Sequence, residues 1–172
     1  MFKMTKVATA VASAFVLAVP LANAQEPAPV KIGVVTFLSG PAAGPFGVPA
    51  RNAAEITIEM LNAGKVPKPF DQKGLGGAKI EMALLDEAGS TTVQVTEFRN
   101  LVQRTGVDLV VGSISSGNCL AIAPVAEELK KLTVFFDCGT PRIFEDASYN
   151  DVFRTSPTST MISASSPCRT LP

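Results

Sequence analysis

The 172-residue sequence contains no histidine and no tryptophan, and it has only one tyrosine and three cysteines. The absence of histidine excludes nucleophilic catalysis by a Ser–His or Cys–His pair, a histidine general base, and metal or haem sites that use imidazole. Fifteen basic residues balance fifteen acidic ones, and the isoelectric point is near 6.3. Nucleic-acid binding needs an excess of positive charge that this chain lacks. We therefore expect neither a histidine-dependent enzyme nor a nucleic-acid partner.

The first 24 residues have the order of a secretory leader. Lys3 and Lys6 precede an apolar run over residues 7–21, and Ala22-Asn23-Ala24 follows it. A basic region, a short apolar region and a small-residue cleavage site together are typical of a signal peptide. The alternative, a membrane-spanning anchor, needs about 20 apolar residues, and this run is shorter. We predict a signal peptide over residues 1–24 and export to the periplasm, where cysteines can pair.

Short apolar runs alternate with helical patterns through the rest of the chain. Runs rich in β-branched and aliphatic residues predict strands at 31–38, 79–85, 107–112 and 133–136. Between them, helices are predicted at 50–64, ending at Gly64, at about 92–105, and up to Lys131 with Pro124 in the first or second turn. This spacing predicts an α/β fold with a parallel sheet flanked by helices on both faces.

Ligands of such sheets bind where the strands end, so the loops at 39–47, 86–91, 113–118 and 137–141 are the candidate regions. Residues 112–117 read Gly-Ser-Ile-Ser-Ser-Gly before a helix. Hydroxyls and free N–H groups there could seat a carboxylate, or the serines could simply cap the helix. Asp86 and Glu87 could form an acid pair or a cation site, but a solvated strand end is the simpler interpretation. With no partner acid or base apparent, we expect no enzyme, no metal and no cofactor.

Cys119 and Cys138 follow two successive predicted strands. A βαβ unit usually makes such strands neighbours, which would bring the two cysteines together. They could form a disulfide or remain two buried free thiols, and either alternative leaves Cys168 unpaired.

Four stretches in order between residues 30 and 160 carry a family resemblance: KIGVVTFLSGPAA, ARNAAEITIEMLNAG, VDLVVGSISSGNCLAIAPVAEELKK and YNDVFRTSPTS. They resemble the branched-chain-amino-acid-type (Leu/Ile/Val-binding-like) substrate-binding proteins of bacterial ABC importers. The resemblance implies a periplasmic, monomeric, non-enzymatic protein of the type I periplasmic-binding-protein fold. Such a protein binds an amino acid or related small carboxylate and passes it to a membrane permease. The alternative is a ligand-sensing extracellular domain of a receptor that uses the same fold.

The resemblance also implies site residues. The ligand carboxylate would be held by Ser116, with Ser115 beside it, and Thr140 would help to bind the α-amino group. Phe46, in the first loop, would lie over the ligand.

Members of this family are much longer, and a second lobe supplies their remaining ligand contacts. We therefore expect residues 25–160 to form the N-terminal lobe alone, with an exposed sheet edge and weak or undetectable binding. The resemblance stops near Met161, and residues 161–172 show no periodicity. We expect an irregular tail there, as a frameshifted or fragmentary gene would produce.

Overall fold

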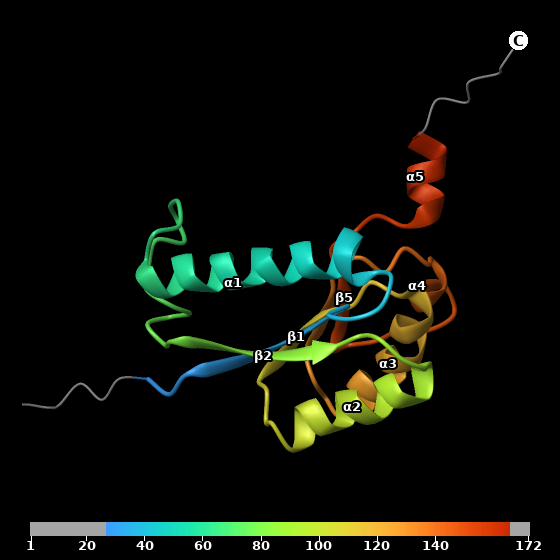
Figure 1. Cartoon of the computed structure of the whole chain (residues 1–172), viewed down its shortest axis with the longest axis horizontal. Coiled ribbons are helices and arrows are strands. Elements are labelled where there is room, and N and C mark those ends of the chain that lie inside the picture. Colours follow the sequence, from blue (N-terminus) through green and yellow to red (C-terminus); the bar gives the residue numbers. More distant parts are fainter. Residues whose placement is uncertain (1–26, 166–172) are drawn as a thin grey trace, which may run out of the picture.

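The computed structural model describes residues 27–165 (Figure 1). The predicted signal peptide and Cys168 lie outside the described residues. In chain order the elements are β1 (Val30–Thr36), a π-helical turn η1 (Ala43–Gly47), α1 (Val48–Ala63), β2 (Ile80–Asp86), α2 (Thr91–Gln103), β3 (Leu109–Gly112), α3 (Ser116–Glu128), β4 (Thr133–Phe135), α4 (Arg142–Glu145), β5 (Val152–Arg154) and α5 (Ser159–Ser165).

The five strands form one sheet in the order β2-β1-β3-β4-β5, and every pair is parallel. The prediction of a parallel sheet flanked by helices is therefore confirmed. Figure 1 shows α1 on one face of the sheet and α2 and α3 on the other. The sequence did not predict β5, because its three residues are too few to show a periodicity.

The apolar core lies between the sheet and the α2–α3 layer. Its fully buried members include Phe98 on α2, Ile122 on α3 and Phe135 on β4. By contrast, α1 contributes no buried residue. An apolar groove of about 380 Å³ runs between α1 and the sheet, and it is lined by Ile32, Val34, Ala50, Ala53, Ala54, Thr57, Ile58, Leu61, Val111 and Phe136. The two faces of the sheet are thus unequally covered.

Helix boundaries follow local chemistry, with one correction. Gly64 ends α1 at φ +64°, as predicted, because a left-handed residue is cheapest as glycine. Ser90 caps α2 by accepting a hydrogen bond from the Val93 N–H. The prediction for Pro124 is wrong: α3 begins at Ser116, so Pro124 lies in the helix interior. The buried side of α3 packs on the sheet, and this packing outweighs the hydrogen bond that proline removes.

A second correction concerns the expected irregular tail. Residues 161–165 are helical, because they continue α5 from Ser159. Thr158 starts this helix, since its hydroxyl oxygen accepts a hydrogen bond from the Met161 N–H at 3.1 Å. The rest of the predicted tail, residues 166–172, is outside the described residues.

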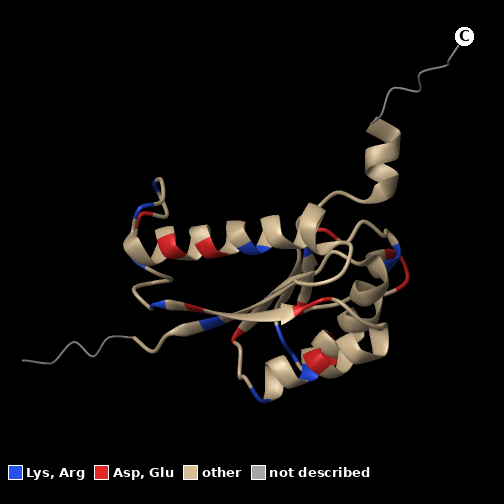
Figure 2. Cartoon of the chain, viewed as in Figure 1, with Lys and Arg blue, Asp and Glu red and all other residues tan. Residues whose placement is uncertain are grey.

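Charged residues of both signs are interspersed along the helices and loops (Figure 2). Within residues 27–165, no helix combines the length and the apolar character needed to cross a bilayer.

Candidate functional site

The carboxyl ends of all five strands meet at one edge of the sheet, because all strands are parallel. The strand order changes direction at β1, which has β2 on one side and β3 on the other. In open α/β sheets a crevice forms at this point, between the loops that leave the two central strands. The loops after β1 and β3 are therefore the first place to look for a ligand.

Two of the predicted residues meet at this edge. The hydroxyl oxygen of Ser116, at the start of α3, accepts a hydrogen bond from the Thr140 main-chain N–H at 3.3 Å. The Thr140 hydroxyl oxygen in turn accepts the Arg142 N–H at 3.4 Å. Both residues are partly exposed. β3 and β4 are neighbours, so the loops that follow them bring Ser116 and Thr140 into contact, and these two residues form the hydroxyl pair of this edge.

The loop that carries Thr140 is held from below by Arg154 on β5. One guanidinium nitrogen donates to the Cys138 carbonyl at 3.0 Å and to the Thr140 carbonyl at 2.6 Å. The guanidinium carbon lies 5.4 Å from the centre of the Phe144 ring, within the range of a cation–π contact. Sequence reasoning missed Arg154, although the residue lies within a stretch that carried the family resemblance. A single arginine at the end of a three-residue strand has no spacing signal of its own.

Cys119 and Cys138 are joined in a disulfide, with their Cα atoms 6.4 Å apart and both residues fully buried. The structure thus contains the first of the two alternatives that the sequence left open. Cys119 lies three residues after Ser116, and Cys138 lies two residues before Thr140. The bond consequently ties together the two segments that carry the hydroxyl pair.

Ser115 is engaged differently from Ser116. Its hydroxyl oxygen accepts the Asn118 N–H at 3.4 Å, as an N-cap does. Its own N–H donates to a carboxylate oxygen of Glu87 at 2.7 Å. The helix-cap alternative therefore describes Ser115, and a ligand contact at this residue stays a prediction.

Glu87 is a buried carboxylate, so interpreting it as part of a solvated strand end is wrong. Besides the Ser115 N–H, it accepts the Ile114 N–H at 2.7 Å and the Asn118 side-chain amide at 3.4 Å. Burial raises the pKa of Glu87, these hydrogen bonds oppose the rise, and the charge of Asp137 adds to it. The Glu87 carboxylate therefore binds the main chain of the loop after β3.

Asp86 fastens the loop after β1 in the same way. Its carboxylate accepts the Leu38 N–H at 2.8 Å, the Ala88 N–H at 3.0 Å and the Ser39 hydroxyl at 2.5 Å. Partial burial raises the pKa of Asp86, but the hydrogen bonds from Ser39, Ala88 and Leu38 outweigh it, so the pKa lies below the ordinary value. Asp86 and Glu87 therefore hold two different loops, which is not the arrangement of a catalytic acid pair.

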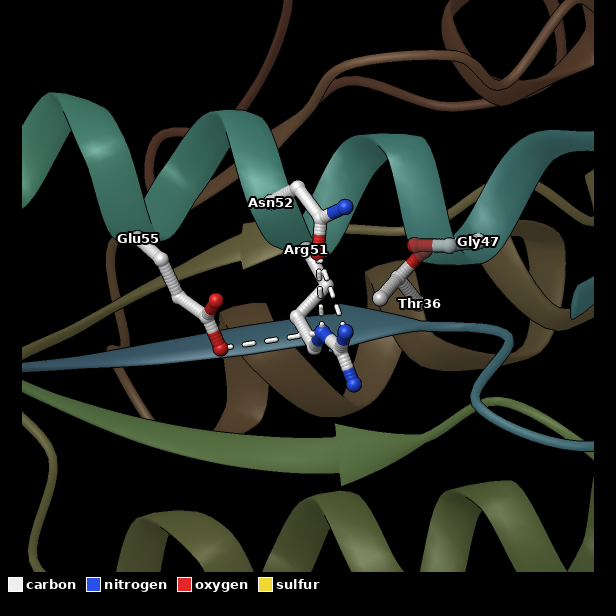
Figure 3. Close-up of polar contacts among 5 residues, drawn as sticks. All are labelled: Thr36, Gly47, Arg51, Asn52 and Glu55. Atoms are coloured by element: carbon white, nitrogen blue, oxygen red, sulfur yellow. Dashed lines mark hydrogen bonds and ion pairs between the residues drawn. The ribbon is translucent and has the colours of Figure 1, made fainter.

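Phe46 lies in the π-helical turn η1 that follows β1, and the residue is 55% exposed. The loop is closed where the Thr36 hydroxyl donates to the Gly47 carbonyl at 3.4 Å (Figure 3). Glycine is required at position 47, because a Cβ atom there would lie 1.7 Å from the Phe37 carbonyl oxygen. The exposed ring is available to a ligand, and its contact with one stays a prediction.

Figure 3 also shows how α1 is stabilised just beyond this loop. Arg51 lies 3.6 Å from Glu55, one turn along the helix, and both side chains are well exposed. Such a pair contributes about 0.3–0.5 kcal/mol, so it serves the helix rather than the site.

Among the described residues, no three His, Cys, Asp or Glu side chains gather in a way that could hold a metal ion. A second hollow of about 380 Å³ lies at the opposite edge of the sheet, where β1 and β2 begin, and includes Pro29 and Lys79. Its location separates it from the hydroxyl pair.

A family model described as periplasmic binding protein matches residues 29–165. Comparison with curated proteins gave no match.

Several solved structures share the fold. LivJ of Streptococcus pneumoniae, a branched-chain amino acid transporter substrate-binding protein solved with isoleucine, is 22% identical with a TM-score of 0.64, over 76% of this chain and 34% of its own. The leucine-binding protein LivK of Thermotoga maritima is 25% identical with a TM-score of 0.63, over 77% and 34%. A solute-binding protein of an ABC transporter from Rhodopseudomonas palustris BisB5, solved with 3,4-dihydroxybenzoic acid, is 24% identical with a TM-score of 0.58, over 76% and 32%.

This chain thus spans about a third of the length of each of these structures. The shared topology is that of the type I periplasmic binding proteins. Because the family model covers most of the sequence and the fold agrees with it, the chain belongs to the periplasmic binding protein family.

Proposed function

We propose that residues 25–160 form the N-terminal lobe of a solute-binding component of an ABC importer, exported to the periplasm. In this role the protein is a monomer without a cofactor, and it delivers a small amino acid or related carboxylate to a membrane permease. The observation that carries the proposal is the hydrogen bond between the Ser116 hydroxyl and the Thr140 N–H at the open edge of the sheet.

The chemistry of this position suits a carboxylate. The Ser116 hydroxyl accepts the Thr140 N–H, which leaves its own proton free to donate. The first N–H groups of α3 have no partner within the helix, and the helix dipole favours a negative charge in front of them. The Thr140 hydroxyl oxygen can accept a hydrogen bond from an ammonium group.

The ligands of two structural relatives carry a carboxyl group, which is the group that we expect Ser116 and the first N–H groups of α3 to bind. Isoleucine and 3,4-dihydroxybenzoic acid each join one carboxyl group to an apolar body. The exposed Phe46 ring could pack against an aliphatic or an aromatic body. We propose a monocarboxylate, with branched-chain amino acids as the first candidates.

On this proposal the described residues supply only part of a site, because the chain spans about a third of the length of its structural relatives. If a complete site binds with about −8 kcal/mol, an even division leaves about −4 kcal/mol, which is a millimolar dissociation constant. We therefore expect weak binding by this chain alone.

A titration of ¹⁵N-labelled protein, residues 25–172, with isoleucine and with 3,4-dihydroxybenzoate tests the proposal. The amide signals of Ser116, Gly117 and Thr140 are expected to shift with millimolar half-saturation. Ser116→Ala should weaken this response, whereas Ser163→Ala, a serine exposed on α5, should leave it unchanged. Shifts confined to other parts of the molecule would refute the site, and submicromolar affinity would refute the one-sided argument.

A further inference from the structure

We propose that Glu87 is the internal anion of the serine loop, residues 113–117, and the positioning residue of the candidate site. Its carboxylate occupies the two main-chain N–H groups that precede α3, so that a ligand carboxylate is confined to Ser116 and Thr140. This inference rests on the proposed function and adds a residue to it.

The geometry is that of a filled anion seat. The two carboxylate oxygens of Glu87 each accept one N–H at 2.7 Å, from Ile114 and from Ser115. The Asn118 side-chain amide donates to both the carboxylate and the main-chain carbonyl of the same residue, each at 3.4 Å. Proteins bind external anions at helix N-termini in the same way, by donating hydrogen bonds from successive main-chain N–H groups. Here the anion belongs to the chain itself.

Burial shields these hydrogen bonds from water. Glu87 has no solvent-exposed surface, so its charge is screened little and its hydrogen bonds do not compete with water. The N–H groups of Ile114 and Ser115 are therefore unavailable to a ligand. Their fixed position sets where Ser116, the next residue, presents its hydroxyl to Thr140.

The seat sits between segments that are far apart in sequence. Glu87 follows β2, whereas Ile114 and Ser115 follow β3, 27 and 28 residues later. A local turn could not supply this contact. The loop after β3 thus takes its shape from a residue on a different crossover.

Removing the Glu87 carboxylate by mutation tests the proposal without the use of an importer ligand. Glu87→Ala leaves two N–H donors facing a vacant space into which formate fits. In ¹⁵N-labelled Glu87→Ala, added formate is expected to shift the Ile114 and Ser115 amide signals with the millimolar half-saturation expected of a three-atom anion. In the wild type, formate should leave these two signals unchanged. Glu59→Ala, which removes an exposed glutamate of α1, is the matched control and should behave as the wild type does.

Each outcome decides the matter. If the Ile114 and Ser115 signals are the same in the wild type and in Glu87→Ala, and formate moves neither, the proposal is overturned. If Glu87→Ala does not fold, Glu87→Gln replaces it: in the wild type both amide signals should follow the ionisation of Glu87, and in the glutamine variant they should be independent of pH. pH-independent signals in the wild type would also overturn the proposal.

Failure of the proposed function looks different in the same spectra. Isoleucine or formate acting at the ligand position moves Ser116 and Thr140, in the wild type as well as in the variant. A silent Ser116 and Thr140 with formate-responsive Ile114 and Ser115 in Glu87→Ala refutes the ligand site and retains the internal anion.

Discussion

Opening the disulfide between Cys119 and Cys138 is expected to lower the free energy of unfolding by about 3 kcal/mol. The cysteines are 19 residues apart. A cross-link closing a loop of about 20 residues removes about 11 cal/mol/K of chain entropy from the unfolded state, or about 3 kcal/mol at 25 °C. For the described residues, about 140 in number, an unfolding entropy of about 2.1 cal/mol/K per residue converts this loss to a Tm lower by about 10 °C.

The assay is urea unfolding, followed by circular dichroism, of the oxidised protein and of the same protein in excess reductant. Reduction removes the cross-link without changing side-chain volume. Cys119→Ala with Cys138→Ala should lose more, because both residues are fully buried and the missing sulfur atoms leave space worth about 1 kcal/mol each. Cys168→Ala is the control and should unfold as the wild type does.

Two results would refute this reasoning. A thiol titration of the denatured, unreduced protein should find one free thiol, and three would mean that the cross-link does not form. Equal urea midpoints with and without reductant would mean that the bond does not stabilise the fold.

Reduction is also expected to weaken the ligand response, because the bond connects α3 to the segment that carries Thr140.

Three further predictions follow from the contacts. Phe98→Ala should cost about 3–5 kcal/mol in urea unfolding, because the ring is fully buried between α2 and the sheet, whereas Phe70→Ala, at 70% exposure, should change stability by less than about 0.5 kcal/mol. Arg154→Met removes the donor to the Cys138 and Thr140 carbonyls, so the isoleucine concentration at half-saturation, measured by NMR, should rise about five- to tenfold; an unchanged value would contradict a role in positioning. Because burial raises the folded-state pKa of Glu87 above its unfolded value of 4.5, the wild type should gain stability relative to Glu87→Gln as pH falls through the raised pKa toward 4.5, and lose it as pH rises. Urea midpoints of both proteins, measured over a series of pH values that ends at 4.5, check the sign, and a constant difference would refute it.

The parallel sheet was predictable because each of its first four strands is an apolar run between recognisable turn residues. Gly64 ended α1 where expected, since its effect on the backbone is local. Pro124 was misplaced for the opposite reason: packing of α3 against the sheet decided where that helix begins. The helical residues 161–165 were missed because the capping contact of Thr158 involves only one turn.

At the candidate site, Ser116 and Thr140 were expected from the family resemblance, but the hydrogen bond from the Thr140 N–H to the Ser116 hydroxyl depends on β3 and β4 being neighbours. Arg154 was not identified, because its two carbonyl partners lie 14 and 16 residues away. Ser115 was expected to lie beside the ligand carboxylate, but in the structure its N–H donates to Glu87 and its hydroxyl caps α3.

The sequence by itself determined the periodicities, the leader-like N-terminus, the absence of imidazole chemistry and the positions of the hydroxyl-rich loops. These properties are local, since each depends on residues within a few positions of one another. Only the tertiary structure decided which polar groups were already satisfied: it buried Glu87 against the serine loop and joined Cys119 to Cys138. Hydrogen bonds across a parallel sheet join segments separated by a whole crossover, and no spacing along the chain specifies which donor meets which acceptor.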